Sequence, residues 1–280
     1  MHFFMFLGGI VYFLTYKPIV SLTQFSKYVR TRFMRLMPAY FLFAILIMVG
    51  KFVSIQFVHV DNPVKSLYDF KMLLLYPTES YSTFLWYIYV LFLFNLFVPV
   101  LMRFVHDKII ILVLLAIILR FLPVPKIFAL HYICRFLLFF ILGVYVVAHY
   151  EKYTTFLDSY FYVLISLFII TLTIIMVFDF YDLATILSFL SLSTLHALVR
   201  RPLVKKSNFL LTFGTYTFPI YLMNTISIGI IKAVILKFTS WDGMHFLYIA
   251  PILFISGLYI PIFVKYIIFT RIPFLDRITW

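Results

Sequence analysis

The sequence is short of charge, cysteine and metal-binding groups, and each shortage narrows what the protein can be. Charged residues make up only 12% of its 280 positions, about half the share of a typical soluble domain, so water is not its main solvent. Cys134 is the single cysteine, which excludes an intramolecular disulfide. No cysteine, histidine and carboxylate grouping has metal-ligand spacing, and no glycine-rich phosphate loop occurs. We therefore expect no metal site and no nucleotide-binding loop of these types.

Long apolar runs take up most of the chain instead. Hydrophobic residues account for 65% of it and aromatic residues for 21%, and a run of about 20 apolar residues crosses a bilayer as a helix. The runs do not alternate with a period of two, which favours helices over a barrel. We expect an all-α, polytopic transmembrane helix bundle, a single membrane-embedded domain over residues 1–280, in the cell membrane. About nine spans are predicted, at residues 3–16, 36–58, 84–104, 108–124, 127–148, 160–178, 181–199, 209–236 and 246–269.

The net charge of +13 would suit a nucleic-acid partner, but its distribution argues against one. Basic residues form short clusters between the apolar runs, as topology signals do. With the N-terminus outside, 15 of the 23 lysines and arginines are cytoplasmic and four are external, while four lie within spans. The cytoplasmic set is Lys17, Lys27, Arg30, Arg32, Arg35, Arg103, Lys108, Lys152, Arg200, Arg201, Lys205, Lys206, Lys265, Arg271 and Arg277. This bias predicts an external N-terminus and a cytoplasmic C-terminus.

The first predicted span, residues 3–16, is short for a crossing and has no basic flank before it. That flank is what a signal peptide would need. We therefore expect that the chain is truncated at its N-terminus and that one further apolar helix belongs upstream.

Five segments, in order along the chain, resemble the acyltransferase-3 family of membrane O-acyltransferases. They are Phe3–Gly9 (FFMFLGG), Phe25–Tyr40 (FSKYVRTRFMRLMPAY), Leu85–Leu91 (LWYIYVL), Phe139–Gly143 (FFILG) and Leu211–Met223 (LTFGTYTFPIYLM). The resemblance covers essentially the whole chain. It implies an enzyme that transfers an acyl group, usually acetyl, from cytoplasmic acyl-CoA to a hydroxyl of a cell-envelope or exported glycan such as an exopolysaccharide. The implied partners are acyl-CoA as donor, a glycan acceptor, the lipid bilayer and polysaccharide biosynthesis proteins, with no nucleic acid.

The chain departs from the family in its histidines. The family's first helix, which carries its proposed catalytic histidine, is absent, and Asn224 stands where members have a histidine after the last motif. His2 precedes the first motif and does not match the family's spacing. We therefore expect these 280 residues alone to be catalytically incompetent.

Arg30, Arg32 and Arg35 are the predicted acyl-CoA site. A spacing of three puts Arg32 and Arg35 on one face at the start of a predicted helix. Guanidinium groups bind phosphate bidentately, and a helix N-terminus adds exposed N–H groups. The resemblance implies the same role for the pair. The alternative is that these arginines only fix the topology.

His131 and Arg135 are the predicted catalytic residues. They are spaced i, i+4 in the outer half of the fifth span, and ionisable groups inside a span usually face a cavity or a partner. His131 would then act as a general base near neutral pH. The alternative is a structural hydrogen bond between helices or an anchor at the membrane interface.

Two other functions stay open. A glycan exporter or flippase would use Arg120, Arg135 and Lys232 to contact an anionic substrate, although inverted repeats and paired broken helices are not visible in the sequence. A non-catalytic membrane subunit of a glycan synthase is the third possibility.

Overall fold

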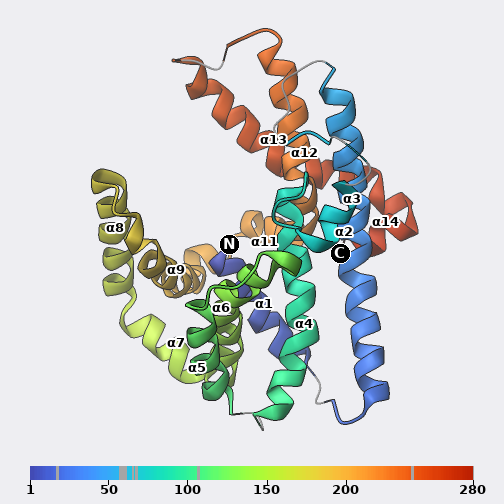
Figure 1. The fold of residues 1–280 in the computed structure, drawn as a ribbon. Helices are drawn as coiled ribbons and strands as arrows, with labels where there is room; N and C mark the ends of the chain where they lie inside the picture. Colours follow the sequence, from blue (N-terminus) through green and yellow to red (C-terminus); the bar gives the residue numbers. More distant parts are fainter. Residues whose placement is uncertain are drawn as a thin grey trace. The chain divides into compact units, whose positions relative to one another are not determined.

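The computed structural model describes residues 1–16, 19–56, 62–64, 66, 69–105, 108–240 and 243–279. Over these ranges the regular structure is helical and contains no strand (Figure 1), which confirms the all-α prediction. The α-helices are α1 (His2–Thr15), α2 (Leu22–Ser54), α3 (Asp69–Leu75), α4 (Trp86–Phe104), α5 (Ile109–Arg120), α6 (Leu130–Ala148), α7 (Tyr150–Ser159), α8 (Phe161–Phe178), α9 (Ala184–Val199), α10 (Pro202–Lys205), α11 (Asn208–Thr215), α12 (Thr217–Leu236), α13 (His245–Ile267) and α14 (Pro273–Ile278). Short 3₁₀ turns are η1 (Thr83–Leu85), η2 (Ile127–Ala129), η3 (Tyr181–Leu183) and η4 (Phe269–Arg271).

Within the described part of the chain, 7 helical segments are long and apolar enough to cross a membrane. They are Leu22–Ser54, Thr83–Phe104, Ile127–Ala148, Phe161–Phe178, Tyr181–Val199, Thr217–Leu236 and His245–Arg271. Two further apolar helices, α1 and α5, are shorter. The protein is thus a multi-pass membrane protein, while the count of nine spans and the orientation stay predictions.

The described residues group into two compact units. Unit 1 comprises Met1–Leu22, Leu93–Pro125 and Leu130–Leu210, and unit 2 comprises Thr23–Phe92, Lys126–Ala129 and Leu211–Trp280, of which Trp280 lies outside the described residues.

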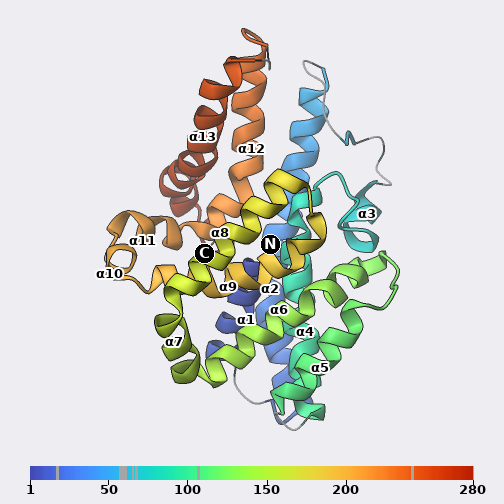
Figure 2. The same ribbon diagram turned by 90° about the vertical axis from the view of Figure 1, so that its left-hand side faces the viewer.

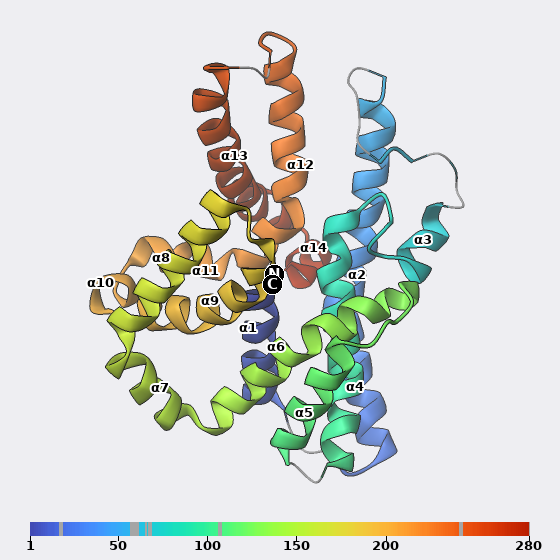
Figure 3. The ribbon, with the colours of Figure 1, turned by 60° about the vertical axis from the view of Figure 1, so that its left-hand side comes forward.

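Unit 1 is centred on a close crossing of α1 and α6, which lie side by side (Figure 3). Two glycines meet at the crossing. A Cβ on Gly9 would lie 1.9 Å from the carbonyl oxygen of Phe140, and one on Gly143 would lie 2.2 Å from that of Phe6. Small residues at helix crossings let backbones approach in a membrane, where van der Waals packing drives association. The first and fourth motifs, FFMFLGG and FFILG, therefore pack against each other through their glycines.

The rest of unit 1 extends from this pair. Helix α5 runs beside α6 (Figure 2), and α8 packs against α9. Outside the spans, Arg200 donates a 2.6 Å hydrogen bond to Asp158 of α7. This bond holds the pKa of the Asp158 carboxyl below its usual value.

Unit 2 joins three of the motifs through tyrosine hydroxyls. Tyr40 of α2 donates to the carbonyl of Leu73 at 2.7 Å, and Tyr89 of α4 donates to that of Leu74 at 3.0 Å. Both carbonyls belong to the last turn of α3, where a helix leaves its oxygens without internal partners. Tyr221 of α12 donates to the carbonyl of Phe84, just before α4.

One predicted span is interrupted. Residues 209–236 form two helices, α11 and α12, separated at Tyr216. Pro219 explains the break, since its ring clashes with the carbonyl four residues earlier, and α11 ends at that residue, Thr215. The hydroxyl of Thr217 donates to the carbonyls of Phe213 at 3.0 Å and Gly214 at 2.9 Å, which satisfies oxygens at the end of α11.

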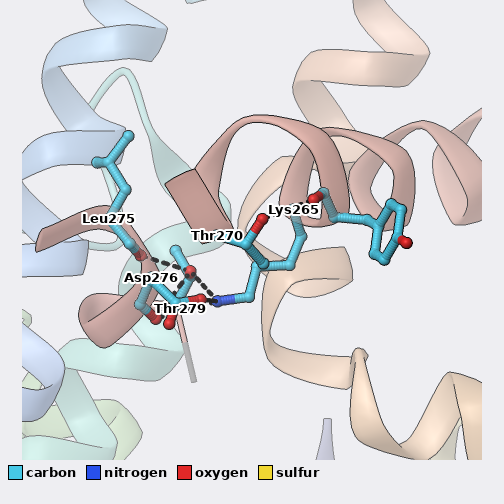
Figure 4. A network of polar contacts seen from close by, with 6 residues as sticks. Lys265, Thr270, Leu275, Asp276 and Thr279 are labelled. Carbon is cyan, nitrogen blue, oxygen red and sulfur yellow. Dashed lines mark hydrogen bonds and ion pairs between the residues drawn. The ribbon is translucent and has the colours of Figure 1, made fainter. Parts of the chain in front are cut away.

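The C-terminal helix α14 is fastened to α13 by a buried lysine (Figure 4). The Lys265 ammonium donates to the Asp276 carboxylate at 2.7 Å, to the Asp276 carbonyl at 3.0 Å and to the Thr279 hydroxyl at 3.0 Å. These three acceptors match the three donors of an ammonium group. Lys265, which the topology count treated as a cytoplasmic cation, is fully buried inside α13.

Candidate functional site

The predicted donor-binding arginines lie on α2, in unit 2. This helix begins at Leu22, so the prediction that Arg32 and Arg35 lie at the start of a helix is wrong. Hydropathy locates only the apolar part of a helix, and the polar first turns from Leu22 contain no glycine or proline that would stop them.

The early start changes the chemistry available to Arg32 and Arg35. Both lie in the interior of α2, about ten residues past its first turn, where backbone N–H groups already bond to carbonyls four residues earlier. The predicted contribution of a helix N-terminus is therefore wrong, because only the first four N–H groups of a helix are left without partners. Any anion binding here depends on the side chains.

The length of α2 places these side chains at a membrane surface. Its 33 residues extend for about 50 Å at 1.5 Å each, whereas the hydrocarbon core is about 30 Å thick. In an upright helix roughly a dozen residues would lie beyond the core, and the polar end from Leu22 to Arg35 is the part suited to that position.

The three arginines do not share one face. Arg32 and Arg35, spaced by three, are neighbours on the helix surface, but Arg30 precedes Arg32 by two residues and lies on about the opposite side. Arg30 and Arg35 are exposed and Arg32 is half-buried. The Arg32 guanidinium lies 5.2 Å from the ring centre of Tyr28 on the preceding turn, a cation–π contact that fixes its direction. A two-arginine face of this kind is suited to phosphate groups.

The predicted catalytic residues lie at the start of α6, in unit 1. His131 is half-buried and its ring lies 4.2 Å from that of Tyr132. The Arg135 side chain is exposed, and its guanidinium lies 5.8 Å from the ring centre of Phe136. Their i, i+4 spacing on one helix is confirmed, because α6 covers both residues.

Beside Arg135 the structure assembles a polar cluster that the sequence did not predict. We use the name outer cluster for His2, Arg120, Arg135, Thr185 and Ser188, since these residues come from helix ends that the charge count predicts to be external. Nδ1 of His2 lies 2.9 Å from the hydroxyl oxygen of Ser188. The histidine ring is 5.0 Å from the ring of Phe136 and 4.4 Å from that of Phe139.

Arg120, the last residue of α5, ties the outer cluster together. Its guanidinium donates to the backbone carbonyl of Arg135 at 2.8 Å and to the hydroxyl of Thr185 at 3.1 Å. The guanidinium also lies 5.5 Å from the ring centre of Phe139. Four separate helices contribute to the cluster, so no local spacing in the sequence could reveal it. The one available signal was an arginine inside an otherwise apolar run.

Other polar residues look structural. His196 lies among aromatic rings, 6.5 Å from Phe6 and 5.4 Å from Tyr153. Asn224, at the position of a family histidine, accepts a 3.1 Å hydrogen bond from the hydroxyl of Thr225. The described residues contain no group of three histidine, cysteine or carboxylate side chains that could hold a metal ion.

Comparison with known proteins decides the family. The family model described as an acyltransferase domain, that of the acyltransferase-3 family, matches residues 1–268. The chain belongs to this acyltransferase family. Neither the comparison with curated proteins nor that with solved structures gives a match.

The family match covers the five motifs and both candidate sites. The match extends from α1 through α13, and it therefore includes the arginine pair of α2 and all of the outer cluster. As an acyltransferase, the protein requires a site for an acyl donor and a site for an acceptor.

Proposed function

We propose that the protein transfers an acyl group, most simply acetyl, from cytoplasmic acyl-CoA to a hydroxyl of a cell-envelope or exported glycan. Membership of the acyltransferase family supports the acyl transfer itself. The observation that carries the choice of donor is the Arg32 and Arg35 face, on the part of α2 that is suited to a position beyond the hydrocarbon core.

Acyl-CoA suits this face because its pyrophosphate and ribose phosphate carry several negative charges close together. Each guanidinium forms paired N–H···O bonds with a phosphate, and Tyr28 holds that of Arg32 in place. Arg30, on about the opposite side of the helix, contributes little to the same phosphate. The predicted cytoplasmic position of these arginines agrees with the compartment in which acyl-CoA is found.

The transfer step needs a proton acceptor near the acceptor hydroxyl. The hydroxyl oxygen forms the new ester bond to the acyl carbon as its proton moves to a base, and the carbon–sulfur bond of the thioester breaks to release CoA as a thiolate, which then takes up a proton. His131, predicted as this base, lies at the same end of unit 1 as the outer cluster. General-base assistance of this kind is worth about 10²–10⁴ in rate.

Binding of the donor tests the proposal directly. Replacing Arg32 and Arg35 together by glutamine removes both charges and keeps the hydrogen-bonding groups. Each charge-assisted contact is worth about 1.5–3 kcal/mol, so the Kd of the protein for acetyl-CoA should rise at least about tenfold. Arg30→Gln, on about the opposite side of α2, is the matched control and should change the Kd for acetyl-CoA by no more than about twofold.

The same measurement with 3′-dephospho-acetyl-CoA identifies the group that is held. If the pair binds the ribose phosphate, this analogue should bind the wild type about as weakly as acetyl-CoA binds the double variant. An unchanged Kd for acetyl-CoA in the double variant would return the arginines to a role in topology and remove the main support for a CoA donor.

A further inference from the structure

The outer cluster carries positive charge without a negative partner. Arg120 donates to a carbonyl and a hydroxyl, both neutral, and Arg135 lies against a phenyl ring. Among the described residues, no carboxylate forms an ion pair with either arginine. Ionisable residues within the apolar helices of a membrane protein usually face a cavity or a partner. The two guanidinium groups are suited to bind an anion.

Arg120 keeps donors available for such an anion. A guanidinium has five N–H groups, and the two hydrogen bonds of Arg120 use one on each terminal nitrogen. The cation–π contact with Phe139 and the bond to Thr185 hold the plane of the guanidinium in a fixed direction. A carboxylate or phosphate can then bind it without rearrangement of the side chain.

His2 offers the complementary group, an acceptor. The hydroxyl of Ser188 donates to the carbonyl of Ala184 at 2.7 Å, so its oxygen accepts a hydrogen bond from Nδ1 of His2 at 2.9 Å. This network assigns the proton to Nδ1 and leaves a lone pair on Nε2. Nε2 is buried and has no hydrogen-bond partner among the described residues. Buried polar atoms are rarely left so, which points to a ligand donor such as a hydroxyl.

We propose that the outer cluster is an acceptor subsite for an acidic sugar, whose carboxylate or phosphate binds Arg120 and Arg135 and whose hydroxyl donates to Nε2 of His2. The inference rests on the proposed function in taking the acceptor to be a glycan, and it adds that this glycan is acidic. A sugar ring presents a hydroxyl and an acidic group together, and the outer cluster presents an acceptor nitrogen and two guanidinium groups.

Sugar binding can be measured without any acyl transfer. The probes are D-glucuronate, D-glucose 6-phosphate and neutral D-glucose, added to the protein in phosphatidylcholine nanodiscs. The wild type should bind at least one acidic sugar ten times or more tightly than glucose, and the acidic probe that binds distinguishes a carboxylate site from a phosphate site.

The variants assign the binding to the cluster. Arg120→Gln and, separately, Arg135→Gln should each weaken the acidic sugar at least about tenfold. Arg135→Gln is the less disruptive of the two changes to the fold. Its side chain is exposed, and the backbone carbonyl of residue 135 still accepts the hydrogen bond from Arg120. His2→Phe keeps a ring between Phe136 and Phe139 but removes Nε2, so it should weaken acidic sugar and glucose alike. Arg103→Gln, an exposed arginine of α4 in the same unit, should change nothing.

Three results would overturn the subsite. The first is equal binding of glucose and both acidic sugars, and the second is no saturable binding of either acidic sugar. The third is that the wild type binds phosphatidylglycerol in the nanodiscs but no sugar, and that Arg135→Gln abolishes this lipid binding. The last result would assign the cluster to lipid headgroups. Failure of the proposed function looks different, because acidic sugars would bind while acetyl-CoA did not.

Discussion

The Gly9→Ala variant should unfold at a markedly lower temperature than the wild type. The added Cβ would lie 1.9 Å from the carbonyl oxygen of Phe140, whereas non-bonded heavy atoms settle at about 3.5–4.0 Å. The obstacle is backbone, so α1 and α6 must separate by roughly 1.5 Å or more along their contact. Overpacking of this kind costs about 1–3 kcal/mol.

Gly229→Ala is the matched control for this change. Gly229 lies inside α12, and a Cβ there would meet nothing within 4 Å. Alanine in a helix interior is favoured over glycine by about 0.5–1 kcal/mol, so this variant should be neutral or slightly stabilised. Thermal unfolding of both variants in detergent measures the difference, at roughly 2–4 °C per kcal/mol. Equal melting temperatures would refute the close crossing of α1 and α6.

Three further changes probe other parts of the structure. Tyr40→Phe removes the hydroxyl that satisfies the Leu73 carbonyl and should cost about 1–3 kcal/mol of stability, seen as a lower midpoint in chemical denaturation. Lys265→Met leaves the Asp276 carboxylate, 36% exposed, without its ammonium; because water reaches this carboxylate, the cost should be about 1–2 kcal/mol. Limited proteolysis should then release α14, and an unchanged cleavage pattern would argue against its attachment through Lys265. His131→Gln keeps hydrogen bonding but removes titration near neutral pH, so acyl transfer should fall about 10²–10⁴-fold; full activity across about pH 6–8 would make His131 structural.

The sequence predicted the helical class, because apolar runs in a bilayer leave helices as the simplest way to satisfy the backbone. It failed where a helix boundary does not follow hydropathy. Helix α2 starts in a polar stretch at Leu22, and the break at Tyr216 follows from the backbone clash of Pro219 inside a continuous apolar run.

The motifs were visible in the sequence, but the reason for them was not. Gly9 and Gly143 are 134 positions apart, and only the crossing of α1 and α6 shows that each makes room for the other. Tyr40 and Tyr89 likewise belong to different motifs and meet at the end of α3. Such contacts depend on tertiary packing, which a pattern along one segment does not contain.

Of the candidate sites, the arginine pair followed from helical spacing and the outer cluster did not. Spacing within one helix placed Arg32 beside Arg35 and His131 near Arg135. The contact between His2 and Ser188 joins residues 186 positions apart, and that between Arg120 and Thr185 joins residues 65 positions apart. Contacts between residues so far apart in the sequence come from the packing of α1, α5, α6 and α9.

Transfer of label from acetyl-CoA to glycan tests the central claim most directly. Membranes containing the chain with a family first helix fused upstream are incubated with acetyl-CoA labelled in its acetyl group, and ester-linked label is counted in the glycan fraction. The wild type should place label on glycan, and the Arg32→Gln, Arg35→Gln variant should need at least about tenfold more acetyl-CoA to reach half its rate. Label that stays on acetyl-CoA with the wild type, or equal acetyl-CoA dependence in the two proteins, would contradict the account.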